Sequence, residues 1–145
     1  MQMTSQSPAS SAAPHSTNTL EADALSASLT VRDLRASIAW YRDVVGFTVD
    51  REMVRDGVLR AVALRAGAVR ILLNQDDGAK GTGRSTGLGF SLNVYTRQSV
   101  DVIADHIRSH GGTLETEPAD MPWGARVFRV RDPDGYALAF SRPLG

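Results

Sequence analysis

Cysteine is absent from the 145 residues, which excludes disulfides, zinc–thiolate sites and thiol nucleophiles. Lysine is nearly absent too, because Lys80 stands alone beside fifteen arginines. Basic and acidic residues balance at 16 each, so there is no excess charge for binding nucleic acid or an anionic membrane surface. No apolar run approaches the roughly 20 residues of a membrane span. These absences favour a soluble globular protein.

The first 23 residues predict a tail. Residues 1–20 contain eight Ser or Thr, two Pro and no Asp, Glu, Lys or Arg. Such a segment buries too little apolar surface to offset the entropy of ordering it. It also lacks the basic start and apolar core of a secretory signal. We therefore expect a cytoplasmic protein with a single domain over residues 24–145.

Residues 24–75 combine one helical stripe with several alternating segments. Alternation of apolar and small polar residues indicates half-buried strands. Asp33 is a predicted helix N-cap, and Gly46 is the predicted end of that helix. Asp56-Gly57 is typical of a tight hairpin. The predicted strands of this half are Leu25–Val31, Phe47–Arg55, Val58–Ala66 and Val69–Gln75.

The same order recurs in residues 87–143, after a linker over residues 76–86 that is rich in Gly and Asp. Ser99–His110 is a predicted helix that ends at Gly111-Gly112. The predicted strands are Leu88–Val94, Thr113–Ala119, Ala125–Arg131 and Tyr136–Ser141. Both halves read β-α-β-β-β, which indicates an internal duplication. The expected fold is α+β, with two such modules forming an incomplete barrel around a cleft.

The strand alternation also predicts which residues face that cleft. One helix covers one face of a four-stranded sheet and leaves the other face bare. Since Leu29 and Val31 suit the helix side, their neighbours point to the cleft; a slip of one residue would invert this assignment. The predicted cleft residues are Ser26, Ser28, Thr30, Arg70, Leu72, Asn74, Gly89, Ser91, Asn93, Tyr95, Ala137, Ala139 and Ser141.

Three motifs carry a family resemblance. Residues 31–47 read VRDLRASIAWYRDVVGF, and the second half adds Pro122-Trp123-Gly124 and the turn RDPDGY at residues 131–136. In this order, within a duplicated β-α-β-β-β frame, the chain resembles the vicinal oxygen chelate superfamily. That superfamily includes glyoxalase I, extradiol dioxygenases, thiol transferases acting on fosfomycin, and bleomycin-resistance proteins.

The resemblance implies four cleft positions where enzymes of the family hold a divalent metal with His, Glu or Gln. They fall here on Ser26, Leu72, Gly89 and Ala139; a shift of two residues gives Ser28, Asn74, Ser91 and Ala137. None offers an imidazole or carboxylate. The resemblance is therefore to the metal-free, bleomycin-resistance-like branch, with no metal and no cofactor.

Other chemistry-bearing residues have simpler interpretations. His106 and His110 have a chelating spacing, but they are expected on the exposed face of the second helix. Residues 78–83 lack the Gly-Lys-Ser/Thr order of a phosphate-binding loop. Asp132 and Asp134 are expected to bind their own turn. No nucleophilic triad is visible, since no histidine is predicted in the cleft.

Trp123 lies just before a predicted cleft strand, where an indole can stack on a flat ligand; a core or dimer contact is an equal alternative. Arg126 and Phe128 follow at alternate positions and are both expected to point inward. Arg60, Arg70 and Arg126 can pair with a ligand carboxylate or phosphate, or with nearby acidic residues.

Three functions remain open at this stage. The first is a metal-free protein that binds a small molecule, for example to sequester an antibiotic or metabolite, as a homodimer with clefts built by both chains. The second is an enzyme of the superfamily, such as a lyase, isomerase or dioxygenase, with a non-standard site. The third is a structural or regulatory module with an empty cleft.

Overall fold

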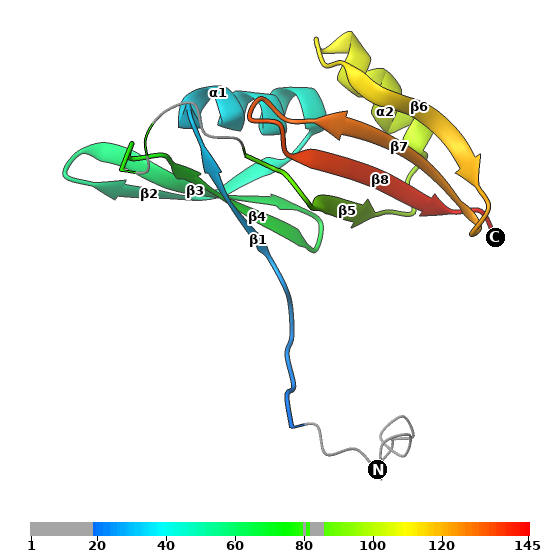
Figure 1. Cartoon of the computed structure of the whole chain (residues 1–145), viewed down its shortest axis with the longest axis horizontal. Coiled ribbons are helices and arrows are strands. Elements are labelled where there is room, and N and C mark those ends of the chain that lie inside the picture. The colour runs from blue at the N-terminus through cyan, green and yellow to red at the C-terminus, as the bar shows by residue number, and fades with distance from the viewer. Residues whose placement is uncertain (1–18, 80, 82–85) are drawn as a thin grey trace.

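Two four-stranded sheets, each with its own helix, make up the described chain (Figure 1). The computed structural model describes residues 19–79, 81 and 86–145. The sheets have the orders β1-β4-β3-β2 and β5-β8-β7-β6, and in each the first pair is parallel. Both stay open and do not close into a barrel. The predicted α+β duplication of two β-α-β-β-β modules is thus confirmed.

The elements follow the predicted order closely. The first module contains β1 (Ala27–Val31), α1 (Leu34–Ala39), the π-helical turn η3 (Trp40–Val45), β2 (Thr48–Arg55), β3 (Val58–Ala66) and β4 (Val69–Gln75). The second contains β5 (Ser91–Tyr95), α2 (Val100–Ser109), β6 (Leu114–Met121), β7 (Ala125–Arg131) and β8 (Ala137–Pro143). Most of the predicted tail, and the linker residues 80 and 82–85, lie outside the described residues.

Local signals in the first module act as expected. The Asp33 carboxylate accepts a hydrogen bond from the Ala36 amide and caps α1. Gly46 adopts φ 113° and ends the helical run. Asp56 and Gly57 both have positive φ, at 55° and 75°, which is the geometry of a type I′ hairpin turn.

The starts of β1 and β5 were predicted too early. Leu25 is 98% exposed and Ser26 also precedes β1. Gly87 and Gly89 have φ of 75° and 83°, so the chain turns here rather than extending. A Cβ at Gly87 would lie 2.8 Å from the Gly135 carbonyl oxygen, so glycine is needed for this close approach. Gly89 is therefore a turn residue and not a strand position.

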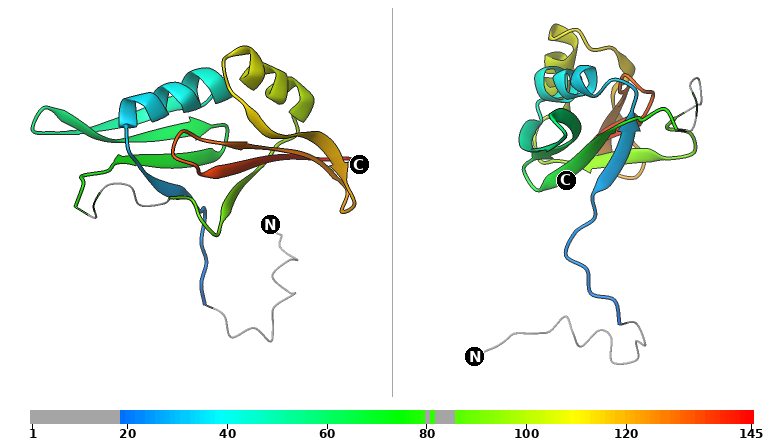
Figure 2. Two further views of the ribbon diagram at one scale, coloured as in Figure 1. Left: turned by 45° about the horizontal axis from the view of Figure 1, so that its top comes forward. Right: turned by 90° about the vertical axis from the view of Figure 1, so that its left-hand side faces the viewer.

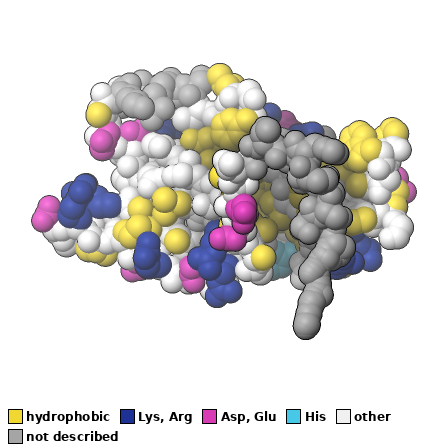
Figure 3. Space-filling view, turned by 90° about the horizontal axis from the view of Figure 1, so that it is seen from below, with side chains coloured by type: hydrophobic (Ala, Val, Ile, Leu, Met, Phe, Trp, Pro, Cys, Tyr) yellow, Lys and Arg dark blue, Asp and Glu magenta, His cyan; other side chains and the backbone are white. Residues whose placement is uncertain are grey.

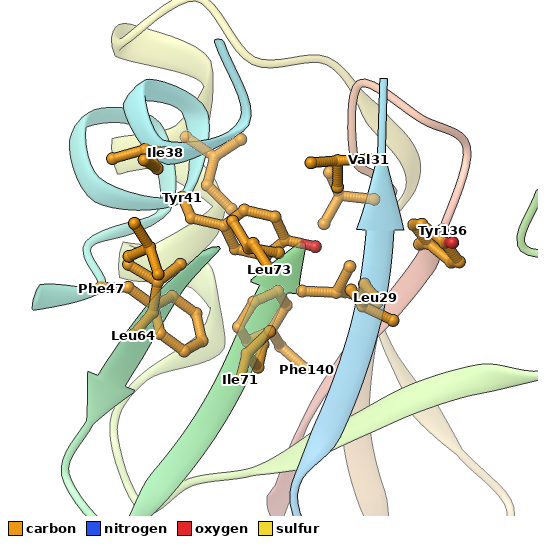
Figure 4. Close-up of a cluster of buried hydrophobic side chains, with 14 of the residues drawn as sticks. Leu29, Val31, Ile38, Tyr41, Phe47, Leu64, Ile71, Leu73, Tyr136 and Phe140 are labelled. Atoms are coloured by element: carbon orange, nitrogen blue, oxygen red, sulfur yellow. The ribbon is translucent and has the colours of Figure 1, made fainter. Parts of the chain in front are cut away.

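Both helices lie on the same side of the sheets (Figure 1 and Figure 2). The inward side chains of both modules join one core, in which the helix-side residues of β1, β4 and β8 meet Tyr41 and Phe47 (Figure 4). Burial of Leu29, Val31, Ile71 and Leu73 confirms the predicted register of β1 and β4. Their sequence neighbours consequently face away from the helices.

The side of the molecule opposite the helices carries hydrophobic side chains interspersed with charged ones (Figure 3). No strand of one sheet pairs with a strand of the other among the described residues. We call the faces of the two sheets that point away from α1 and α2 the open faces. None of the helices in the described part of the chain is long and apolar enough to span a membrane.

The β7–β8 turn fastens the second module to the first. The Tyr41 hydroxyl donates to Asp132 Oδ2 at 2.8 Å, and the Ser37 hydroxyl donates to Asp134 Oδ2 at 3.3 Å. The Arg32 amide donates to Asp134 Oδ1 at 2.9 Å. Asp132 Oδ1 also accepts from the amides of Asp134 and Tyr136, as predicted for a carboxylate that organises its own turn. The bonds across the junction were not predicted.

Burial shifts the proton equilibria at this junction. It raises the pKa of Tyr41, and the neighbouring Asp132 raises it further. Burial also raises the pKa of Asp132, although the hydrogen bond from Tyr41 opposes that shift. Because the folded chain holds both protons more tightly than the unfolded chain, each group contributes less to stability as the pH rises through its titration range.

Removal of the Tyr41 hydroxyl by Tyr41→Phe leaves a buried carboxylate oxygen without its side-chain donor. We expect the free energy of unfolding in urea to fall by about 1–3 kcal/mol at neutral pH. Tyr95→Phe is the matched control, because Tyr95 is 73% exposed; it should leave the unfolding free energy unchanged. Equal effects of the two substitutions would contradict a fastening role for Tyr41.

The same pair predicts a dependence on alkaline pH. Above about pH 10 the unfolded chain releases the Tyr41 proton while the folded chain keeps it, so the stability of the wild type falls as the pH rises. Its advantage over Tyr41→Phe should therefore shrink by about 1.4 kcal/mol per pH unit. An advantage that stays constant through the alkaline range would contradict the raised pKa of Tyr41.

Candidate functional site

The centres of the open faces are built by the parallel strand pairs. In the first sheet Ser28 lies opposite Leu72, and Thr30 lies opposite Asn74. In the second, Ser91 lies opposite Ala137 and Asn93 opposite Ala139. Parallel pairing thus brings most of the predicted cleft residues into two matched groups, one on each sheet.

The first open face is polar, and several of its side chains already form hydrogen bonds with neighbouring residues. The Asn74 side-chain amide donates to Ser28 Oγ at 2.8 Å and to the Leu29 carbonyl oxygen at 3.4 Å. This contact confirms that Ser28 and Asn74 share a face. Arg70 donates to Asp50 on β2 at 3.3 Å, so its charge already has a partner. The surface around Leu72 therefore offers an aliphatic side chain, a hydroxyl and an amide.

The second open face has an apolar floor. Ala125, Val127 and Ala139 form a small buried cluster, and Met121 packs against it. This cluster is separate from the main core. Asn93 is exposed beside Ala139, and Tyr95 is 73% exposed at the end of β5. The face combines small aliphatic side chains with an amide, with the exposed Arg129 opposite Ala139, and with a phenol at its edge.

The residues present do not fit a metal ion. The open-face positions of β1, β4, β5 and β8 carry hydroxyl, amide, aliphatic, phenol and guanidinium groups. A divalent ion in a protein needs imidazole or carboxylate donors. Over residues 19–79, 81 and 86–145, no group of three or more His, Asp or Glu side chains is arranged to hold one.

The two histidines of the second module lie where the sequence predicts. His106 and His110 are exposed on α2, with rings stacked at 4.0 Å. His110 Nδ1 contacts the His106 carbonyl oxygen at 2.8 Å and Ser109 Oγ at 3.1 Å. These contacts hold the imidazole against its own helix end, away from the open faces.

The predicted inward orientation of Phe128 and Arg126 is wrong. Phe128 is fully buried on the helix side and stacks on Phe140 at 5.0 Å. Arg126 donates to Asp101 at 2.8 Å and to Asp120 at 2.9 Å. These hydrogen bonds raise the pKa of the guanidinium. Arg126 therefore pairs with nearby acidic residues, which was the alternative to a ligand contact.

Three further predicted site residues lie at edges. Arg60 is exposed at an irregularity in the β2–β3 pairing, between Leu59 and Ala61. Ser26 and Gly89 lie outside the strands. The structure therefore brings together Ser28, Leu72 and Asn74 on one open face, and Ser91, Asn93 and Ala139 on the other.

Trp123 is 72% exposed in the turn between β6 and β7. The next residue, Gly124, has φ 93° and closes this turn. Trp123 is therefore not a core residue, which leaves a ligand contact or a dimer contact. The floor formed by Val127 and Met121 was not predicted, because β7 carries apolar residues on both faces and its alternation does not decide which of them faces the core.

Comparison with known proteins agrees with this architecture. The family model for the glyoxalase/bleomycin resistance protein/dioxygenase superfamily matches residues 23–140. TioX from Micromonospora sp. ML1 is 22% identical with a TM-score of 0.68, covering 84% of this chain and 100% of TioX. A lactoylglutathione lyase from Agrobacterium tumefaciens is 22% identical with a TM-score of 0.61, covering 84% and 95%.

A glyoxalase/bleomycin resistance protein/dioxygenase from Nocardioides is 21% identical with a TM-score of 0.64, covering 87% of each chain. At these identities the likeness extends to the fold. No curated protein matches the chain.

The side chains of the open faces predict that divalent metals do not change the thermal stability of the protein. Dialysis against EDTA, followed by addition of Zn²⁺, Ni²⁺ or Mn²⁺, should leave the melting temperature unchanged, because the described residues contain no cluster of three or more imidazole or carboxylate groups. The double substitution His106→Ala/His110→Ala is the control for adventitious binding on α2. A stoichiometric metal retained by that variant, measured by elemental analysis, would contradict this assignment.

Proposed function

We propose that this chain, which belongs to the glyoxalase/bleomycin resistance protein/dioxygenase superfamily, is a metal-independent protein that binds a small molecule. The observation that carries the proposal is the side-chain set of β1, β4, β5 and β8. Of the positions where the family resemblance places metal ligands, Leu72 and Ala139, with Ser28, Asn74, Ser91 and Ala137 of the shifted set, lie on the open faces. They offer shape and hydrogen bonds in place of metal coordination.

The site is proposed to form between two copies of the chain. Both helices cover the same side of the sheets, so each open face lacks a covering layer. A sheet with one solvated face is stable when that face is polar, but the second open face has the apolar floor of Ala125, Val127 and Ala139. In a two-fold dimer, the first sheet of one chain would cover the second sheet of its partner.

The chemistry of the two faces restricts the ligand. Arg65 and Arg70 share Asp50, and Arg129 is exposed opposite Ala139. The amides of Asn74 and Asn93 and the Ser28 hydroxyl supply neutral polar groups near the centre, beside aliphatic side chains. A flat or amphipathic molecule fits this set best, such as an aromatic antibiotic or metabolite. Trp123 would stack on it or complete the dimer contact.

An enzyme with a non-standard site is the alternative. General acid–base catalysis needs a group such as His, Glu, Asp or Lys within hydrogen-bond reach of the substrate. The open-face positions of β1, β4, β5 and β8 carry none of these residue types. Because these strands supply no general acid or base to the open faces, we favour ligand sequestration over catalysis.

A thermal-shift screen tests the binding function directly. The library should contain aromatic antibiotics and flat metabolites, in buffer with EDTA. A ligand present at a hundred times its Kd stabilises the folded state by about 2.7 kcal/mol, which raises the melting temperature by several degrees. Failure of a broad library to shift the melting temperature, or consumption of a compound seen by mass spectrometry, would contradict sequestration.

The composite cleft makes a separate prediction. Leu72→Arg places a charge at the centre of an open face and should weaken both the dimer and ligand binding. Val102→Arg makes the same change on α2, where Val102 is 65% exposed, and should affect neither. Light scattering should give twice the chain mass for the wild type and Val102→Arg. A monomeric wild type that binds ligand, or equal behaviour of the two variants, would overturn the two-chain site.

A further inference from the structure

The two modules meet at two junctions that the internal duplication makes equivalent. At the first, the β7–β8 turn packs on the end of β1 and the start of α1. At the second, the β3–β4 turn lies across a pocket from the end of β5 and the start of α2. Counting from the helix caps Asp33 and Ser99, Ser37 corresponds to Ile103 and Tyr41 to Ile107.

The first junction is filled. Asp132 and Asp134 reach from their turn to the Tyr41 and Ser37 hydroxyls, and the Tyr136 hydroxyl donates to the Thr30 carbonyl oxygen at 2.9 Å. Each large side chain of this turn thus has a partner in the first module. Polar groups on α1 match polar groups on the turn.

The second junction is hollow. The turn between β3 and β4 is Gly67-Ala68, which has no side chain larger than a methyl group. Across from it, α2 presents Ile103 where α1 has Ser37. A pocket of about 600 Å³ lies here, between the β3–β4 turn and the loop from β5 to α2, and it reaches the edges of the open faces through Arg65 and Tyr95. Its size lies within the 300–1,000 Å³ typical of pockets for small molecules.

The lining has two parts of different chemistry. Eight apolar residues form one part: Val45, Phe47, Ala66, Ala68, Val69, Val94, Ile103 and Phe140. Thr96, Arg97 and Gln98, from the loop between β5 and α2, supply polar groups. Thr48, Tyr95 and Arg65 add to them, and the Arg65 guanidinium already pairs with Asp50. Among the described residues none with an acidic side chain lines the cavity, and none forms an ion pair with Arg97.

We propose that this second junction is a binding site for a small amphipathic anion, an aromatic or aliphatic carboxylate whose apolar body fills the cavity and whose carboxylate pairs with Arg97. A guanidinium matches a carboxylate through two parallel hydrogen bonds. This site is separate from the one in the proposed function, since neither Leu72 nor Ala139, at the centres of the open faces, lines it. It gives the protein two separate places for small molecules.

The probe pair is 4-phenylbutyrate and its neutral analogue 4-phenylbutanamide, titrated into the full chain and followed by amide chemical shifts. The carboxylate should shift the amides of residues 66–69 and 94–98, with an affinity about tenfold higher than that of the neutral amide, as expected for one charge-assisted contact. Arg97→Gln should remove this preference. Arg35→Gln, on the exposed surface of α1, should keep it.

Filling the cavity provides a second variant. Ala68→Trp enlarges the exposed turn, where folding should survive, and is expected to abolish binding of both probes. Shifts confined to residues 28, 72, 93 and 139 would overturn the second site while favouring the open-face site. Equal affinity of wild type and Arg97→Gln for the carboxylate would overturn the anionic specificity, and no shifts at all would overturn the site.

Discussion

One-sided covering of the sheets is the constraint on which the rest of the structure depends. Both helices pack on the same side, so the alternating side chains of each strand divide into a shared core and an open face. The core side is occupied by large aliphatic and aromatic residues. The open side holds small hydroxyl, amide and aliphatic residues together with the arginines Arg65, Arg70 and Arg129, and this set decides what chemistry the faces support.

The two junctions between the modules differ in their side chains. One turn carries carboxylates and a tyrosine, and the facing helical segment presents hydroxyls to the carboxylates. The equivalent turn carries only glycine and alanine, and the facing helix presents isoleucine. The filled junction fixes how the modules sit, whereas the hollow junction leaves room for a ligand. The equivalent junctions therefore have different roles: one holds the two modules together, and the other provides a pocket for a ligand.

Much of this fold could be predicted from local patterns. The bounds of β3, β4 and β7 agree with prediction, because Asp56-Gly57, Gly67 and the flanking turns delimit them. The orientation of Phe128 was not predictable from alternation, since β7 carries apolar residues on both faces. The bond from Tyr41 to Asp132 joins residues 91 positions apart, and no local pattern connects them. Gly89 was placed in a strand because its neighbours Leu88 and Phe90 alternate, although its positive φ turns the chain.

Amide hydrogen exchange with and without a bound ligand, in buffer stripped of divalent metals, tests the central claim most directly. The account predicts that a ligand slows exchange in β4 and β8, the strands that carry Leu72 and Ala139, with no metal present. Protection that appears only after a divalent metal is added would contradict it, because binding would then depend on coordination that the open faces do not provide.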